Sequence, residues 1–184
     1  MSKATFYFEW LGVDKNQFRI LALLAPTGEY TGNLSDMCRC LNLRSQTRNR
    51  KRLKASITEL TDDGYITSTL KGRTYFLRAN TKETVIKIPA EWLDQIMSHN
   101  YSSESVSWQA VLKVLLWILS NKEPIVTRYM IAADLNCGVD TITSAFNVLE
   151  RDFNAIVRDI IIKQKENGDF RCVGLELTAV AWWD

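Results

Sequence analysis

The sequence holds few of the residues that catalysis and metal binding require. Its 184 residues include one histidine and four irregularly spaced cysteines. The cysteines form no Cys-x₂-Cys pair with a histidine nearby, and neither a glycine-rich phosphate loop nor a Ser/His/Asp set is present. We therefore predict a protein that is not an enzyme and that uses no metal and no cofactor. The predicted structural thiols, in a reducing compartment, are Cys38, Cys40, Cys137 and Cys172.

Long apolar runs are absent as well. The most apolar stretch, 108–119, is about a dozen residues long and contains Lys113, whereas a membrane-spanning helix needs about 20 apolar residues. The N-terminus has one lysine followed by an aromatic-rich segment, which is unlike a signal peptide. The sequence therefore predicts a cytoplasmic protein without membrane contact. Aromatic clusters at 6–10 and 182–183 are predicted to pack on the core or on a partner.

Charge is distributed unevenly along the chain. The net charge is only +2, but residues 1–80 carry 13 Lys/Arg and 7 Asp/Glu, whereas residues 81–184 carry 10 and 14. Such halves are typical of a basic module that binds nucleic acid beside a module with a different task.

Acidic residues are missing where basic residues are densest. Six of the residues 44–54 are Lys or Arg, and no Asp or Glu occurs between Asp36 and Glu59. The exposed face of an ordinary helix interleaves acids and bases, which pair at i,i+4. The acid-free segment therefore predicts a surface that binds a polyanion.

The apolar periodicity of the first half predicts three helices and a hairpin. Candidate N-caps are Asp14 for the first helix, Asn33 or Ser35 for the second and Ser45 for the third. The predicted helices cover about 14–25, 33–41 and 46–62. The predicted strands cover 65–70 and 73–77, around a tight turn.

The second half repeats this order. We predict a first domain at 1–80, a linker strand and helix at 81–106, and a second domain at 107–184. In the second domain, helices are predicted at about 108–119, 127–135 and 139–152, and strands at 157–165 and 170–177. His99 lies in a polar seam of the linker, and no acid or nucleophile is evident as its partner. It is predicted to be a linker residue rather than a catalytic base.

The order helix, helix, turn, helix and hairpin, found twice, resembles the winged helix-turn-helix superfamily. Ala132, Asn136 and Ile142 match the family's small residue in helix two, its turn residue with left-handed geometry and its branched apolar residue in helix three. Residues 53–66 resemble the passage from helix to wing in many bacterial regulators. The resemblance implies a mainly α fold with small β-wings (α+β), made of two winged helix-turn-helix domains in tandem.

On this resemblance, residues 45–62 form a recognition helix for double-stranded DNA. A helix in the major groove needs cations near the phosphates and polar side chains near the base edges. We expect Arg48, Lys51 and Arg52 to reach bases or phosphates, and the wing tip to touch the adjacent backbone or minor groove. The predicted DNA contacts are Arg44, Ser45, Thr47, Arg48, Asn49, Lys51, Arg52, Lys71 and Arg73.

The third helix of the second half is less basic. Its outward positions include one cation, Arg151, and one acid, Asp140, which would face phosphates unfavourably. We therefore expect the second domain to be an interaction unit, or to form a homodimer through the C-terminal half. A weaker second DNA contact is the alternative. It would use Thr143, Ser144, Asn147, Lys163 and Lys165.

The leading prediction is a sequence-specific DNA-binding protein that regulates transcription and is associated with the nucleoid when bound to DNA. A plasmid- or phage-type DNA replication initiator or accessory protein with tandem winged helices is the alternative, because it needs the same groove chemistry. A third class is a protein–protein adaptor that does not bind DNA. The basic helix disfavours this class.

Overall fold

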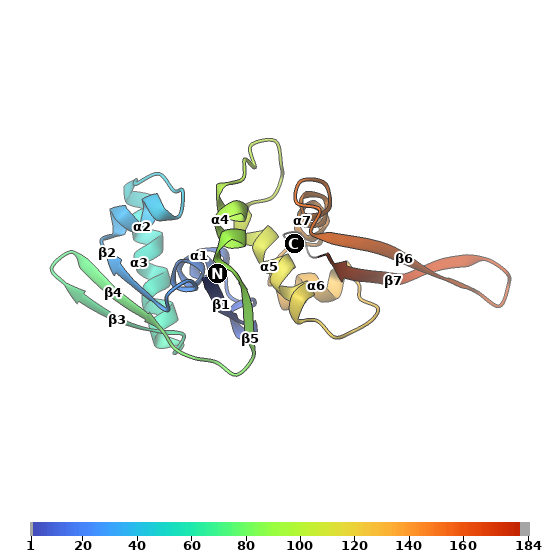
Figure 1. Ribbon diagram of the computed structural model, residues 1–184, viewed down its shortest axis with the longest axis horizontal. Coiled ribbons are helices and arrows are strands. Elements are labelled where there is room, and N and C mark those ends of the chain that lie inside the picture. Colours follow the sequence, from blue (N-terminus) through green and yellow to red (C-terminus); the bar gives the residue numbers. More distant parts are fainter. Residues whose placement is uncertain (1, 181–184) are drawn as a thin grey trace. The chain divides into compact units, whose positions relative to one another are not determined.

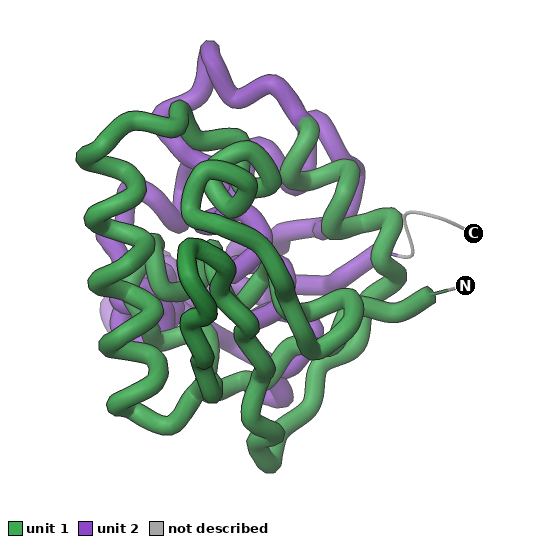
Figure 2. The backbone as a smooth tube through the Cα atoms, turned by 90° about the vertical axis from the view of Figure 1, so that its left-hand side faces the viewer, with its two compact units in different colours: residues 1–98 green, residues 99–184 purple. Residues whose placement is uncertain are grey.

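The computed structural model describes residues 2–180 (Figure 1). Over this range the chain has an α+β fold, in which seven α-helices accompany several small antiparallel sheets. The chain divides into two compact units, residues 1–98 and residues 99–184, which Figure 2 colours green and purple. No helix within residues 2–180 combines the length and apolarity that crossing a membrane requires.

Unit 1 (residues 1–98) consists of four α-helices, a short 3-10 turn and two small sheets. The strands are β1 (Lys3–Tyr7), β2 (Glu29–Gly32), β3 (Ile66–Lys71), β4 (Thr74–Ala79) and β5 (Val85–Pro89). The helices are α1 (Lys15–Leu24), α2 (Leu34–Cys40), α3 (Thr47–Asp62) and α4 (Ala90–Ser98), and the turn is Phe8–Trp10. One sheet has the strand order β2-β4-β3 and the other pairs β1 with β5.

Side-chain caps fix where α1 and α2 begin. Asp14 and Gln17 form a capping box, in which Asp14 Oδ1 accepts the Gln17 N–H at 3.0 Å and Gln17 Oε1 accepts the Asp14 N–H at 3.2 Å. Asn33 caps α2 by accepting the N–H groups of Ser35 and Asp36. The predicted cap at Asp14 is confirmed, and Asn33 is the cap of the second helix.

The N-terminus of α3 differs from the prediction. Gln46, not Ser45, occupies the N-cap, and its side chain makes no capping hydrogen bond. Instead, the Asn49 amide and the Gln46 N–H both donate to the carbonyl oxygen of Arg44, each at 2.8 Å. These two bonds hold the preceding turn against α3. Ser45 stays exposed, so its predicted capping role is wrong.

The core of unit 1 is built around α3 and the N-terminal aromatic segment. Leu53, Ile57 and Leu60 of α3 are buried, as the helical periodicity predicts, and α3 packs on α1, α2 and β3. Phe6 and Trp10 are buried as well, with ring centroids 6.1 Å apart. The second predicted aromatic cluster, 182–183, lies outside the described residues.

The boundary between the units falls at Ser98, inside the segment 81–106 that the sequence predicts as a linker strand and helix. Both elements exist, as β5 and α4, but they are packed in unit 1. β5 pairs along its whole length with β1, and Leu93 and Ile96 of α4 are buried. This packing depends on a strand from the other end of the unit, which local periodicity cannot reveal.

The described part of unit 2 (residues 99–184) contains three helices and a long hairpin. The helices are α5 (Trp108–Ser120), α6 (Arg128–Asp134) and α7 (Val139–Arg151). The strands are β6 (Ile156–Gln164) and β7 (Phe170–Ala179). α5 is buried on nearly all sides, as its apolar composition predicts, and packs on α7. The β6–β7 hairpin extends well beyond α6 and α7 in Figure 1.

The two units share one order of elements. In unit 1, β2 lies between α1 and α2 and pairs with β4, the second strand of the hairpin. In unit 2, Val126 lies between α5 and α6 and forms two backbone hydrogen bonds, of 2.9 and 2.7 Å, with Leu175 of β7. The approach is so close that a Cβ atom at Gly174 would lie 2.8 Å from the Val126 carbonyl oxygen, so this position requires glycine.

The turns between the second and third helices also agree. Asn42 follows α2 with a φ of 53°, and Asn136 follows α6 with a φ of 50°. Asparagine tolerates this left-handed region better than most residues other than glycine. In each turn the asparagine N–H donates to the carbonyl three residues back, that of Arg39 or Ala133. The left-handed geometry predicted for Asn136 is confirmed, and Asn42 repeats it.

Candidate nucleic-acid interface

α3 presents its basic residues to solvent. The buried stripe of Leu53, Ile57 and Leu60 fixes the rotation of the helix about its own axis, so the opposite face stays open. The exposed cations on α3 and the turn before it are Arg44, Arg48, Lys51, Arg52 and Lys54. Every cation that the sequence predicted for DNA contact in this segment is therefore at the surface.

None of these cations forms an ion pair with a residue in the described range 2–180, where the ion pairs lie elsewhere. Besides burial, the positive charge of one of these cations lowers the pKa of an arginine on a neighbouring helix. Burial lowers the pKa of Arg19 on α1 below its ordinary value, and the positive charge of Arg52 lowers it further. The exposed face of α3 thus concentrates positive charge.

The short polar residues at the start of α3 have different surroundings. Ser45 and Thr47 are exposed, and the Thr47 hydroxyl accepts a hydrogen bond from Arg50 at 3.4 Å. Asn49 is half-buried, and its amide holds the carbonyl of Arg44. The structure therefore uses Asn49, predicted as a reader of bases, to position the start of the helix.

The β3–β4 hairpin carries the other two predicted contacts. Lys71 pairs with Thr74 across a tight turn formed by Gly72 and Arg73, and Gly72 has the positive φ, 61°, that such turns require. Lys71 and Arg73 are exposed at this tip. The Lys71 Nζ atom lies 5.5 Å from the centroid of the Phe76 ring, which steadies the side chain.

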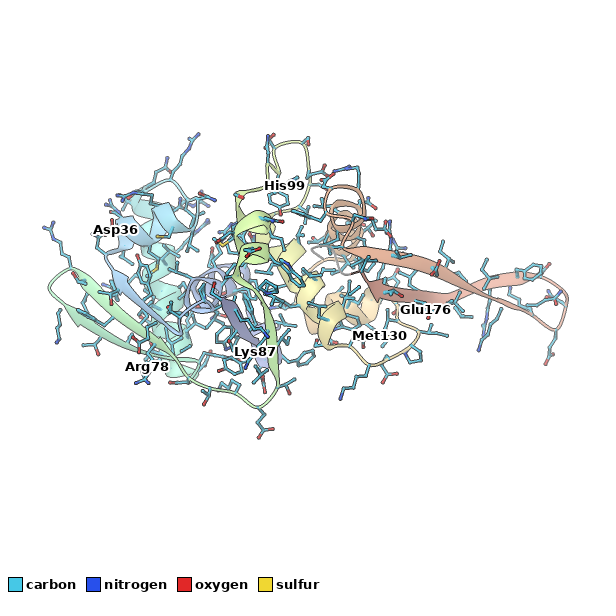
Figure 3. The ribbon with its side chains drawn as sticks, in the orientation of Figure 1. Asp36, Arg78, Lys87, His99, Met130 and Glu176 are labelled. Carbon is cyan, nitrogen blue, oxygen red and sulfur yellow. The ribbon has the colours of Figure 1, made fainter. Side chains whose placement is uncertain are left out.

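A groove of about 520 Å³ lies between α2, α3 and the β3–β4 hairpin. Among the described residues that line it, the only acid is Asp36, labelled in Figure 3, which lies 3.4 Å from Arg39. The lining cations are Arg39, Arg50, Lys54 and Arg73. The first three are missing from the predicted contact set. Helical periodicity could have suggested Lys54, but only the return of the hairpin toward α2 and α3 creates the groove.

α7 has the place in unit 2 that α3 has in unit 1, but its polar side chains are engaged within the unit. The hydrogen bonds join Arg128 to Thr143 (2.9 Å), Arg158 to Asn147 (3.0 Å) and Ser105 to Ser144 (2.9 Å). The three α7 residues predicted as a second DNA contact therefore already have partners inside unit 2.

Two arginines at α7, Arg151 and Arg158, are paired with acids. Arg151 donates to both carboxylate oxygens of Asp152, at 2.6 and 2.8 Å, and also bonds to Glu104. These hydrogen bonds raise the pKa of Arg151 above its ordinary value. Arg158 forms a bidentate pair with Glu150, at 2.7 and 2.5 Å. The surface of α7 is an acid–base network, in contrast to that of α3.

The remaining residues of the predicted second contact lie toward the tip of the β6–β7 hairpin. Lys163 is near the end of β6, and Lys165 begins the turn, where its N–H donates to the carbonyl of Asp169 at 2.6 Å. Both lysines are exposed, and so are Glu166 and Asp169 beside them. The acids dilute the positive charge of this tip.

His99 is not the isolated linker residue that the sequence predicts. Its Nε2 atom lies 3.2 Å from Asp152 Oδ2, and its ring packs against those of Tyr101 and Phe153, with centroids 4.7 and 5.0 Å away. Figure 3 labels it just after the end of α4. The expectation that His99 has no acidic partner is wrong, because Asp152 lies far from it along the chain. His99 and Arg151 therefore share Asp152 as their partner.

Within residues 2–180 no group of three or more His, Cys, Asp or Glu side chains is suited to hold a metal ion. Cys38 is buried and Cys40 is exposed, and neither is in a disulfide.

The chain matches no protein-family model and no curated protein. The charges and contacts of its own residues therefore carry the functional proposal.

The Arg151–Asp152 pair makes the stability of unit 2 depend on pH. Hydrogen bonds from Arg151, and then the charges of Arg151 and His99, lower the pKa of Asp152 below its ordinary value. The carboxylate therefore stabilises the folded state above the pKa of an unfolded aspartate, about 3.9, and this contribution is lost as the pH falls through the lower folded value. We expect Asp152→Asn to lower the free energy of unfolding in urea at pH 7, with a smaller difference from the parent below about pH 4.

Glu166→Gln is the matched control, because Glu166 is exposed and has no ion pair within the described residues. It should change the free energy of unfolding by less than about 0.5 kcal/mol at either pH. A gap between Asp152→Asn and the parent that stays constant from pH 7 to pH 3 would contradict the assignment.

Proposed function

We propose that both units are winged helices and that unit 1 binds double-stranded DNA in a sequence-specific manner, as a regulator of transcription. In this proposal α3 enters the major groove and the β3–β4 hairpin is the wing. Unit 2 has the same element order but serves for interaction. The observation that carries the proposal is the difference in charge between α3 and α7.

The shared element order supports the winged-helix proposal. Each unit runs helix, extended segment, helix, turn, helix, hairpin, and in each the extended segment pairs with the second strand of the hairpin. Each turn has an asparagine in the left-handed region. A helix-turn-helix with such a hairpin places its third helix on the outside, where it can enter a groove of DNA.

The chemistry of α3 supports contact with DNA. Exposed arginine and lysine side chains can pair with phosphates or with the acceptor edge of guanine in the major groove. Arg48, Lys51 and Arg52 project from one end of a helix that is rigidly packed on the core of unit 1. Because they have no acidic partners within residues 2–180, phosphates would not have to displace an internal ion pair.

The groove between α3 and the wing supplies a second kind of contact. Arg50 and Lys54 on α3 line this groove together with Arg73 at the wing. We propose that a stretch of the DNA backbone lies along its mouth, where these cations neutralise phosphates without reading sequence.

Unit 2 is proposed to contribute little to DNA binding. Arg151 and Arg158 are paired with Glu104, Glu150 and Asp152, so contact of these two arginines with phosphates would first require those pairs to break. The cations of α3 have no such ion pair to break within the described residues.

The first test replaces single cations of α3. Arg48→Ala and Lys51→Ala should each weaken binding to a selected duplex by about 1–3 kcal/mol if they read bases, that is about 5- to 150-fold in Kd. Fluorescence anisotropy at fixed salt measures this loss. Circular dichroism should show an unchanged fold, because both side chains are exposed.

Asp140→Ala and Asn147→Ala are the matched controls on α7. They should change the Kd for DNA much less than the α3 variants do. Equal losses from α3 and α7 would mean that the chain has two reading helices, and the proposed division between the units would be wrong.

The second test concerns the groove. Lys54→Ala and Arg73→Ala should each make the plot of log K against log salt concentration shallower by about 1, because each removes one phosphate contact. Their effect should be similar on different duplex sequences. The matched control is Arg78→Ala on β4, since Arg78 lies 3.7 Å from Glu29. If Arg78→Ala flattens the plot as much as Arg73→Ala does, the groove has no special role.

A further inference from the structure

The outer edge of β6 is open. The sheet of unit 2 has the order β6-β7, and Val126 covers part of the other edge of β7, but no described strand pairs with the outer side of β6. An open edge presents N–H and C=O groups that can pair with a strand of another chain. Natural edge strands are usually protected by charge, proline or covering segments.

β6 is unusually apolar for an open edge. Its sequence is Ile-Val-Arg-Asp-Ile-Ile-Ile-Lys-Gln, and Val157, Ile160 and Ile162 are 45%, 64% and 58% exposed. Phe170 on β7, which pairs with Gln164 of β6, is 69% exposed. The edge strand β3 of unit 1 differs, because half of its residues are threonine or serine. The apolar edge is therefore particular to unit 2.

The charges of the hairpin are unmatched within it. Asp159 of β6 stands directly opposite Glu176 of β7, and Lys163 of β6 stands directly opposite Arg171; Glu176 is labelled in Figure 3. None of the four forms an ion pair with another residue of 2–180. Like charges directly opposite each other destabilise an antiparallel pair. The isolated hairpin thus has a negative row and a positive row, with isoleucines between them.

We propose that β6 pairs with β6 of a second copy of this chain, antiparallel and around a two-fold axis at Ile161. The segment 159–163 reads Asp-Ile-Ile-Ile-Lys, which is complementary to itself in that orientation. Asp159 comes opposite Lys163 of the second copy, and Ile160 opposite Ile162 of the second copy. The acidic pair Asp159–Glu176 of one copy then lies beside the basic pair Lys163–Arg171 of the other copy. Each like-charge pair of the hairpin therefore gains neighbours of opposite charge.

The backbone hydrogen bonds of the hairpin permit this register. Val180 N–H donates to the Ala155 carbonyl and Lys165 N–H donates to the Asp169 carbonyl, so odd-numbered residues of β6 direct their backbone groups toward β7. Even-numbered residues, such as Ile160 and Ile162, direct theirs to the open edge. In the proposed register the backbone of Ile160 in one copy forms hydrogen bonds with the backbone of Ile162 in the other copy. The irregularity of the hairpin lies in β7, at Val173, and leaves the edge of β6 regular.

A register shifted by one residue toward the start of β6 is less favourable. A shift of the two-fold axis to Ile160 would place Asp159 opposite Ile161 and Arg158 opposite Ile162 of the second copy. That arrangement places isoleucine side chains against charged ones. It also gives no opposite charge to the like-charge pairs Asp159–Glu176 and Lys163–Arg171. The proposed dimer forms one continuous four-stranded sheet, β7-β6-β6-β7, with the isologous contact that two-fold symmetry requires. The inference does not depend on DNA binding.

Charge reversal tests the register. Sedimentation velocity of the full chain, without DNA and over a series of concentrations, should show a monomer–dimer equilibrium. Asp159→Lys should raise the dimer dissociation constant by about tenfold or more, because two attractive pairs become repulsive. The double variant Asp159→Lys with Lys163→Asp should return it to within about threefold of the parent. Asp159→Lys also turns the like-charge pair with Glu176 into an opposite-charge pair inside the hairpin, so the fold should not suffer.

A cysteine cross-link tests the axis. In the proposed register Ile161 faces itself as a non-hydrogen-bonded pair with Cα atoms about 4.5 Å apart, which suits a disulfide. Ile161→Cys should therefore form a dimer under mild oxidation, with the 161–161 bond identified by peptide mapping. Val157→Cys is the control, because Val157 is exposed on the same face but would come opposite Lys165 of the second copy, away from its own counterpart.

Three results would overturn the proposal. They are a chain that stays monomeric at all concentrations, a dimer whose dissociation constant the charge reversals leave unchanged, and equal cross-linking from positions 157 and 161. Loss of DNA binding in the α3 variants, with the dimer unchanged, would leave this inference standing. Loss of the dimer in the β6 variants, with binding of single sites retained, would leave the proposed function standing.

Discussion

Positive charge without acidic partners is the constraint on which the proposed role of unit 1 depends. The buried stripe of α3 fixes which residues meet water, and the sequence places no acid between Asp36 and Glu59. The cations of α3 therefore repel one another, and a polyanion can relieve that repulsion. α7 has the same place in the element order, but its Arg151 is bound to carboxylates and its Glu150 is bound to Arg158 of β6. The third helix of each unit thus has the same place in the element order but a different surface charge. The difference depends on whether acidic residues lie near its cations.

The hairpins of the two units differ in the same sense. The tip of β3 and β4 is a short cationic turn beside a groove lined by arginine and lysine. The β6–β7 hairpin is longer, has an isoleucine-rich open edge and holds its charges in rows of one sign. The first suits phosphates, whereas the second suits a surface with complementary charges and apolar side chains. We therefore propose a chain with one module for DNA and one for assembly.

Local features of the fold could be predicted from the sequence, and long-range features could not. The caps at Asp14 and Asn33 and the left-handed Asn136 follow from residue chemistry within a few positions. The start of α3 was misplaced at Ser45 because a hydrogen bond from Asn49 to the preceding turn replaced the expected cap. The groove cations Arg39 and Arg50, the packing of β5 on β1 and the pairing of His99 with Asp152 all join residues far apart in sequence. Periodicity contains no information about such contacts.

Photo-cross-linking to duplex DNA that carries photoreactive bases tests the central claim most directly. Mass spectrometry of the cross-linked peptides locates the contacts on the folded, full-length chain without any substitution. The account predicts that they fall in residues 44–54 and at the tip of the β3–β4 hairpin. Cross-links concentrated on α7, or cross-links that spare residues 44–54, would contradict it.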